Sequence, residues 1–255
     1  MLSCHICNPS LCNDNLPGIA LVTFLTRTLS TLSLRYSHRF LFIPGTIGSI
    51  TWLSRHEAQA ARVRHGFVVA GVGDAGAFTY KKSRRGDAGI DRAFAHVLQH
   101  SGDNSAIIDF FPYGYDERQF CSPGFNLPVG CAMRTPYGQY PQYHTSADDI
   151  SFLNLPCLVD SFRKCLSVVS VLEHDSAYIN LNPKCEPQLG KRGLYRAIGG
   201  QAEGAVDELT LLWVLNLSDG HHSLLDIAER AGCPFAAVKV AADALLQHGL
   251  LRKAE

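Results

Sequence analysis

The segment 3–18 of the chain holds the densest group of side chains that could carry out chemistry. It contains one imidazole, one carboxylate and three thiols within a dozen residues: His5, Asp14, Cys4, Cys7 and Cys12. These are side-chain types that bind zinc in proteins. The segment is an irregular polar loop followed by an apolar helical stretch, and such loops lie where open α/β sheets bind ligands. We therefore expect the reactive centre to include this loop.

Three further groups of the same types follow apparent strands: Asp74, Asp116 and His144. On a parallel sheet such loops converge at one edge, so residues far apart in sequence can share a site. Imidazole and carboxylate ligands suit zinc, and carboxylates bridge the ions of two-metal hydrolases. Each residue alone is more typical of a surface group or a turn. The joint pattern predicts a zinc site.

The cysteines permit another interpretation. Cys4 and Cys7 form a C-x-x-C pair, which is compatible with half of a structural zinc knuckle or with a redox motif. No second C-x-x-C pair follows in the sequence. The nine cysteines are scattered and odd in number, so we expect reduced, mostly buried thiols in a cytoplasmic protein.

The elements that must position these groups alternate between helices and strands. Periodicity predicts helices over 16–34, 90–100 and 150–174, buried strands over 39–44, 65–72 and 106–111, and a more exposed strand over 77–84. This order indicates an α/β domain with a mostly parallel sheet flanked by helices. No residues precede the loop at 3–18 to form the strand that should lead into it. Residues 112–149 are expected to be a long functional loop, whose Arg134, Tyr137 and Tyr143 are candidates for lining a substrate pocket.

The composition changes near residue 180. Short helical blocks over 207–217, 224–231 and 234–248, followed by an apolar strand, predict a winged helix-turn-helix unit. We expect an enzyme-like domain over 1–178, a linker over 179–204 and the winged-helix domain over 205–255. The only basic residue of the third block is Lys239, and a DNA reader should present a basic surface. We therefore expect a module for homodimerisation or a protein partner, and DNA binding is the weaker alternative.

The overall composition is that of a globular protein. Hydrophobic residues make up 46% of the 255 residues, and 23 basic residues balance 23 acidic ones. This composition excludes a wholly disordered chain and gives no reason to expect a nucleic-acid or membrane partner. No apolar run approaches the length of a membrane span, and the start lacks the features of a secretory signal.

Five segments, taken together, resemble the aminopeptidase-like domain of the zinc-exopeptidase superfamily. In chain order they are HICNPSLCNDNLPG, RFLFIPGTIGSI, GVGDAGAFTYKKSRRGD, DERQFCSPGFNLP and YHTSADDISF. The segments NLNPKCEPQLGKRGLYRAIGG and LLWVLNLSDGHHSLLDIAERAGCPF resemble the tail of a subgroup that carries a C-terminal winged helix-turn-helix and is linked to polysaccharide biosynthesis. The resemblance covers nearly the whole chain.

The resemblance implies a role for five residues. His5 resembles the imidazole ligand of a first zinc ion, Asp14 the carboxylate that bridges two ions, and Asp74 the ligand that completes the first site. His144 resembles the imidazole of the second site. Asp116 resembles the acid that orients the catalytic pocket.

The chain also departs from this subgroup. Gly45 stands where a metal-binding glutamate is expected, Asn8 replaces a histidine, and the paired glutamates that supply a general base have no obvious counterpart. The chain begins inside the first motif, as a fragment truncated at its N-terminus would. We therefore expect a weakened zinc metallohydrolase of peptides or amides that holds one or two zinc ions. The alternative is a catalytically inactive binding or regulatory protein that keeps the fold.

Overall fold

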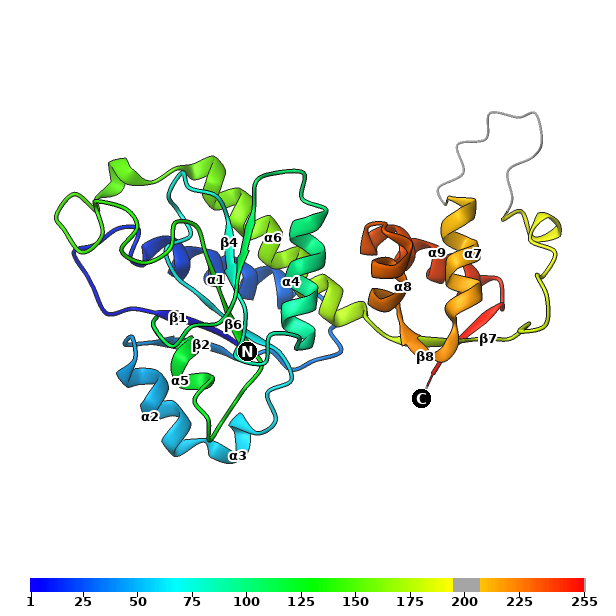
Figure 1. The fold of residues 1–255 in the computed structure, drawn as a ribbon, viewed down its shortest axis with the longest axis horizontal. Helices are drawn as coiled ribbons and strands as arrows, with labels where there is room; N and C mark the ends of the chain where they lie inside the picture. The colour runs from blue at the N-terminus through cyan, green and yellow to red at the C-terminus, as the bar shows by residue number, and fades with distance from the viewer. Residues whose placement is uncertain (195–206, 255) are drawn as a thin grey trace. The chain divides into compact units, whose positions relative to one another are not determined.

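The computed structural model describes residues 1–194 and 207–254 (Figure 1). The chain forms two compact units, Met1–Leu172 and Glu173–Glu255, and each is described by itself. Within the described ranges, no helix is both long and apolar enough to cross a membrane.

The first unit is built on a six-stranded sheet with the order β2-β1-β3-β6-β4-β5. The strands are β1 (Leu2–His5), β2 (Phe40–Ile43), β3 (Gly66–Val69), β4 (Thr79–Lys81), β5 (Ala106–Ile108) and β6 (Val129–Met133). All neighbours pair in parallel except β4 and β6, which are antiparallel. The expected mostly parallel α/β architecture is confirmed.

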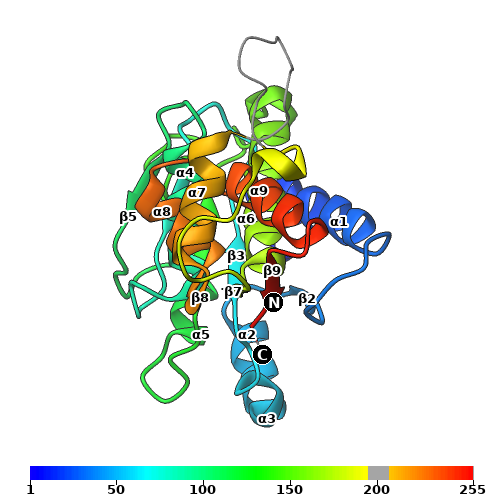
Figure 2. The same ribbon diagram turned by 90° about the vertical axis from the view of Figure 1, so that its right-hand side faces the viewer.

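Helices cover both faces of this sheet (Figures 1 and 2). One face carries α1 (Leu16–Leu29), α4 (Gly89–Gln99) and α6 (Leu155–His174), and the other carries α2 (Ile47–Arg55), α3 (Glu57–Ala60) and α5 (Glu117–Phe120). Alternate residues of β6 point to the α2 side, where Val129, Cys131 and Met133 join a core that includes Trp52 and Phe120. Their burial follows from the two-residue periodicity of a strand.

The prediction that no residues remain for a strand before the first loop is wrong. Leu2–His5 form β1, which lies between β2 and β3 and is buried along its whole length. Four residues are enough because both neighbours supply hydrogen bonds and pair with it in parallel. The loop between His5 and Leu16 therefore does follow a strand.

Two expectations about the middle of the chain are also wrong. β4 is fully buried, because Tyr80 stacks on Phe94 of α4 and the Lys81 ammonium pairs with Glu117 at 3.0 Å. The region expected to be one long loop, 112–149, contains α5 and the central strand β6. A short 3₁₀ helix, Ile150–Phe152, precedes α6.

The second unit has the three helices and the terminal strand that the sequence predicts. The helices are α7 (Glu208–Leu217), α8 (Leu224–Ala231) and α9 (Phe235–Gln247), with α7 packed against α9 (Figure 2). The strands β7 (Ala177–Asn180), β8 (Asp219–Ser223) and β9 (Leu251–Lys253) form an antiparallel sheet with the order β8-β7-β9. This is a winged helix-turn-helix fold.

Local signals explain where α8 begins and ends. The Ser223 hydroxyl accepts from the Asp226 amide at 3.3 Å, and the Asp226 carboxylate accepts from the Ser223 amide at 2.7 Å. Gly232 ends the helix in the left-handed conformation, at φ 64°. The boundary expected between 178 and 179 lies inside β7, and a short 3₁₀ helix, Gly190–Arg192, lies in the expected linker. Positions 195–204 of that linker lie outside the described residues.

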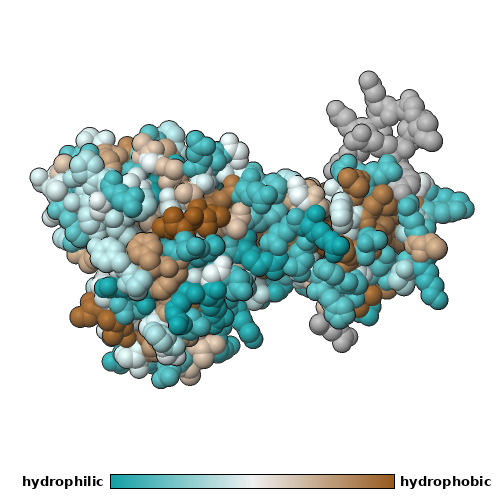
Figure 3. Space-filling view, viewed as in Figure 1, coloured by the Kyte–Doolittle hydropathy of each residue, from teal (hydrophilic) through white to brown (hydrophobic). Residues whose placement is uncertain are grey.

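The surface shown in Figure 3 is mixed in character. Hydrophobic side chains form small patches between hydrophilic ones on this face. Several large apolar side chains of the first unit are exposed, among them Phe24, Ile47, Ile150 and Leu155. Single exposed apolar residues are normal on a folded protein.

Candidate functional site

Asp14 is the centre of a cluster of buried and half-buried polar groups. Its Oδ1 lies 2.5 Å from His5 Nε2, and its Oδ2 lies 3.0 Å from His144 Nε2. His5 and Asp14 are buried, whereas the His144 side chain is 49% exposed. The cluster is therefore exposed to solvent at His144, and His5 lies at its buried end. The structure brings together three of the four predicted metal ligands.

Tyr115 completes this cluster, and the sequence did not single it out. Its hydroxyl donates to Asp14 Oδ2 at 3.2 Å and lies 3.0 Å from His144 Nε2. Its ring stacks on the His5 imidazole, with centroids 4.4 Å apart and an interplanar angle of 5°. One signal was present in the sequence, since Tyr115 directly precedes the predicted acid Asp116.

The loop that carries Asp14 is held by Asp148, a residue also missed. One oxygen of the buried Asp148 accepts from the Asn13 amide at 2.6 Å, and the other accepts from the Asp14 amide at 3.1 Å. The Asn15 side chain donates to Val69 O at 2.8 Å and accepts from the Gly71 amide at 3.1 Å. These bonds fix the loop against the end of β3.

Asp74 is buried but is engaged by other protein groups. Its Oδ1 accepts from the Thr135 hydroxyl at 2.6 Å and from the Gly76 amide at 2.7 Å. Its Oδ2 accepts from the Asn13 side chain at 3.2 Å. Asp74 thus ties the loop after β3 to the Asp14 loop and to the segment after β6.

Asp116 lies behind the cluster and is fully buried. Its Oδ1 accepts from the Thr46 amide at 2.7 Å, which anchors the turn between β2 and α2. Its Oδ2 is buried and has no hydrogen-bond partner among the described residues. The predicted catalytic acid therefore contacts the backbone next to Gly45, and no hydrogen bond joins it to His5 or Asp14 among the described residues.

The three predicted substrate-lining residues are placed differently from one another. The Arg134 guanidinium is buried and donates to Gly76 O at 2.7 Å, to Cys157 O at 2.8 Å and to Asp160 at 3.1 Å. The Tyr137 hydroxyl lies 2.9 Å from Cys131 Sγ. Tyr143 is half-buried, stacks on His144 and has its hydroxyl 3.3 Å from that of Tyr115. Tyr143 borders the cluster, and so does the Tyr137 ring, which contacts the Tyr115 ring, whereas Arg134 has its hydrogen bonds elsewhere.

Burial and hydrogen bonding shift the pKa values of the acidic groups here. Burial acts to raise the pKa of Asp14, but the hydrogen bonds from His5 and Tyr115 outweigh it and hold that pKa below its usual value. Burial, together with the neighbouring Tyr143 and Asp14, raises the pKa of Tyr115. Burial also raises the pKa of Asp116. At neutral pH Asp14 is thus an ionised acceptor and Tyr115 a neutral donor.

The donor set does not fit a complete zinc centre. Each Asp14 oxygen meets one imidazole only, so either side of the carboxylate offers two protein ligands, and catalytic zinc commonly has three. Position 45 is a glycine and contributes no ligand atom. In residues 1–194 and 207–254, no group of three or more His, Cys, Asp or Glu side chains is placed to hold a metal ion.

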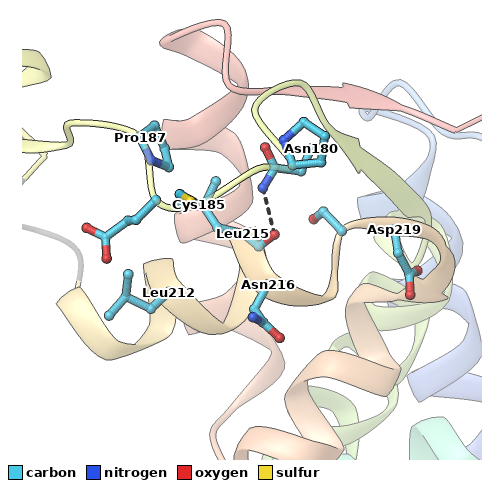
Figure 4. A pocket seen from close by; sticks show the side chains of 10 residues that line it. Asn180, Cys185, Pro187, Leu212, Leu215, Asn216 and Asp219 are labelled. Atoms are coloured by element: carbon cyan, nitrogen blue, oxygen red, sulfur yellow. Dashed lines mark hydrogen bonds between the residues drawn. The ribbon is translucent and has the colours of Figure 1, made fainter.

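The second unit contains a separate pocket of about 500 Å³ (Figure 4). It lies between the segment 180–187 and α7, with Asn180 donating to Leu215 O at 2.9 Å. Its lining includes Cys185, Leu212 and Asp219. None of the predicted site residues lines this pocket.

The fold and this cluster define an aminopeptidase-like protein joined to a winged helix. A profile described as a domain of unknown function (DUF4910) matches residues 1–175, and a winged helix-turn-helix profile matches residues 176–253. The chain belongs to the DUF4910 family.

Known proteins support this assignment. A Clostridium acetobutylicum protein, provisionally named a polysaccharide biosynthesis protein with an aminopeptidase-like domain, is 53% identical over 252 residues, which are 99% of this chain and 58% of the relative. A crystal structure from the same organism, provisionally described as a peptidase, matches with a TM-score of 0.92 at 50% identity, over 99% of this chain and 56% of that one. The chain thus spans little more than half the length of these relatives.

More distant structures share the fold of the first unit. A zinc aminopeptidase from Bacillus subtilis matches with a TM-score of 0.59 at 18% identity, over 67% of this chain and 45% of that one. An aminopeptidase from Aneurinibacillus sp. strain AM-1 matches with a TM-score of 0.56 at 17% identity, over 68% and 42% of the two chains. At these identities the likeness establishes the fold alone.

Proposed function

We propose that the first unit binds a peptide or a small amide through an aminopeptidase fold and does not hydrolyse it by metal-activated water. The arrangement of ligands around Asp14 carries this proposal. Its two oxygens are divided between His5 and His144, while Asp74 is engaged by Thr135 and Gly76. This leaves a polar recognition site that lacks a third ligand on either side of the carboxylate.

The cluster has the groups needed to recognise an amide or an amine. The Asp14 carboxylate is a charged acceptor, and the Tyr115 and Tyr143 hydroxyls can donate or accept. The exposed His144 ring and the half-buried Tyr143 ring stack on each other, with centroids 3.9 Å apart. Together they offer a flat apolar surface beside polar atoms, which is typical of small-ligand sites.

Binding and turnover can be measured on the same sample. We expect short peptides with a free N-terminus to bind in calorimetry, and aminoacyl anilides to remain uncleaved in the presence of added zinc. His144→Ala should weaken peptide binding about tenfold, the loss of roughly one charged hydrogen bond. Tyr36→Phe, which alters a ring that contacts His65 instead, should leave the affinity unchanged. Cleavage that requires zinc and stops on chelation would refute the proposal.

A weakened zinc aminopeptidase is the second candidate. The observation that favours it is the meeting of two imidazoles on the two oxygens of one carboxylate, since bridging carboxylates occur in two-metal hydrolases. Stoichiometric zinc in the purified chain, lost together with activity in His5→Ala, would support this candidate over the first.

For the second unit we propose an interaction module that binds a protein partner or a second copy of the chain. Lys239 of α9 is paired with Asp243 at 2.5 Å, so its charge is partly neutralised within its own helix. Nucleic-acid binding needs unpaired basic groups on one surface. We expect no salt-sensitive retention on duplex DNA, and a mobility shift that weakens steeply with salt would contradict this.

We also propose a cytoplasmic location. All nine cysteines lie within the described ranges and are free thiols, which suits a reducing compartment. Fractionation of cells that express the tagged chain tests this proposal.

A further inference from the structure

The Tyr115 hydroxyl lies within hydrogen-bond distance of both Asp14 and His144. It is 3.2 Å from Asp14 Oδ2 and 3.0 Å from His144 Nε2, and those two atoms are 3.0 Å from each other. The three atoms thus form a triangle with nearly equal sides. Without Tyr115, a carboxylate oxygen and an imidazole nitrogen at this separation could both bind one cation.

The Tyr115 ring also fills the space in front of Gly45. A Cβ atom built on Gly45 would lie 3.1 Å from Cδ1 and 3.4 Å from Cε1 of this ring, and 3.2 Å from Cys7 Sγ. Position 45 is therefore directed at Tyr115 and Cys7, and even a methyl group there would crowd both side chains. A longer side chain that carried a ligand atom would need the ring to move away.

The ring is held in this place from several sides. It stacks on His5, meets the Tyr137 ring at 5.4 Å in a T-shaped contact, and its hydroxyl reaches that of Tyr143 at 3.3 Å. Aromatic contacts of this kind each add stability beyond simple burial. Tyr115 is thus a packed part of the site.

We propose that Tyr115 takes the place that a metal ion bound by Asp14 and His144 would occupy. The site is then a metal-independent cluster of His5, Asp14, Tyr115 and His144. This arrangement depends on glycine at position 45, because a larger side chain there would displace the Tyr115 ring. The inference deepens the function proposed above and rests on the same site. Tyr115 acts as a positioning residue that fixes Asp14 and His144 in place of a cation. Zinc binding on this side and the observed placement of Tyr115 are mutually exclusive.

Zinc stoichiometry of purified variants tests the inference. Gly45→Glu adds a carboxylate but leaves the ring in place, so we expect it to bind no more zinc than the original chain. Gly45→Glu with Tyr115→Ala removes the ring and should bind about one further zinc ion per chain, with three protein ligands. Gly45→Glu with Tyr115→Phe keeps the ring and should stay poor in zinc.

Gly45→Glu with Tyr113→Ala is the matched control, because Tyr113 lies in the same loop and its side chain is 62% exposed. This control should bind as little zinc as Gly45→Glu alone. Equal zinc in Gly45→Glu and in its Tyr115→Ala double variant would overturn the inference. So would a Tyr113→Ala double variant that gains as much zinc as the Tyr115→Ala one.

A second measurement does not depend on the double variants folding. Tyr115→Phe removes only the hydroxyl, so we expect the NMR signals of the His144 ring to shift, whereas Tyr36→Phe should leave them in place. Unchanged His144 signals in Tyr115→Phe would overturn the inference.

The two proposals fail separately. Failure of the original chain to bind peptides would refute the proposed function, yet a gain of zinc on removal of Tyr115 from Gly45→Glu would still support the inference. Conversely, peptide binding without cleavage supports the function even where Tyr115→Ala adds no zinc.

Discussion

Asp148 shows how one buried carboxylate can hold a functional loop. Its two oxygens accept from the consecutive amides of Asn13 and Asp14, and its side chain is almost fully enclosed. Charged acceptors of this kind stabilise backbone donors more than neutral ones do. The position of Asp14, and hence of the whole cluster, depends on this contact.

We predict that Asp148→Asn lowers the free energy of unfolding of the first unit by about 2 kcal/mol. The change replaces a charged acceptor by a neutral amide, and the new NH₂ group would face one of the backbone N–H groups that Asp148 now accepts from. Urea denaturation followed by tyrosine fluorescence measures the loss. Asp149→Asn is the control, since Asp149 is exposed and caps only the short helix at Ile150–Phe152. Equal destabilisation by both changes would show that Asp148 does not hold the loop.

Part of this cluster could be predicted from the sequence. His5, Asp14 and His144 were expected to converge, and they do, because loops at one end of a parallel sheet meet at the same edge. Asp148 was missed, since two acidic residues before a helix are also favoured by the helix dipole. Tyr115 was missed because its role comes from contacts with residues 101 and 29 positions away.

At the scale of elements, β6 pairs with both β3 and β4 and so connects the two halves of the sheet. It is also the strand that the sequence pattern did not indicate. Its segment VGCAM is short and rich in small residues, and it lies in a region rich in proline and glycine. Gly130 is needed there because a Cβ would lie only 2.0 Å from the Tyr80 hydroxyl of β4. The alternation of apolar and polar residues along a strand gives no sign of such a close approach between a glycine backbone and a side chain of the next strand.

Gly130→Ala is therefore expected to destabilise the first unit by about 3 kcal/mol. The buried Tyr80 ring can avoid the new methyl group only by giving up its hydrogen bond to Asp91 and its stack on Phe94. Gly124→Ala provides the comparison, because a Cβ there meets nothing within 4 Å and φ is not positive. The difference between their urea midpoints is the measurement. A Gly130→Ala midpoint equal to that of Gly124→Ala would contradict the account of β6.

The β8 strand of the second unit gives a prediction about pH. Hydrogen bonds from the His221 and His222 amides and from the His222 ring lower the pKa of Asp219 to about 2, against an ordinary value of 3.8. Because the folded-state pKa is the lower one, ionised Asp219 stabilises the fold above about pH 4, and this contribution is lost as the pH falls toward about 2.

Asp219→Asn should remove this pH-dependent part. We expect the stability difference between the original chain and Asp219→Asn to shrink between about pH 4 and about pH 2, as measured by urea unfolding followed through the amide signals of α8. Asp243→Asn, which alters the carboxylate paired with Lys239 on α9, is the comparison. A constant difference for Asp219→Asn across this range would refute the assignment.

At the scale of the whole molecule, the chain contains two units with separate cores. In the second unit, Leu211, Val214, Leu224, Val238 and Leu245 are fully buried. Its sheet draws β7 from the residues on either side of the expected start of the linker, and β9 from residues 251–253. All of its secondary structure lies after residue 173.

We predict that residues 173–255 fold without the first unit and unfold cooperatively in urea, because this segment contains a hydrophobic core and all three strands of an antiparallel sheet. Starting the fragment at residue 182 instead deletes β7 and should abolish the transition. Circular dichroism and dispersed amide signals report the outcome. A folded fragment lacking β7, or an unfolded 173–255, would be evidence against this division.

The carboxylate of Asp148 also sets an order of events during synthesis. The amides of Asn13 and Asp14 are made well before their acceptor, which follows 135 and 134 positions later in the chain. Contacts so distant in sequence close large loops and form slowly. The segment that carries Asn13 and Asp14 is thus translated long before the carboxylate that holds it, so this loop gains its contact with Asp148 only when nearly the whole first unit has been made.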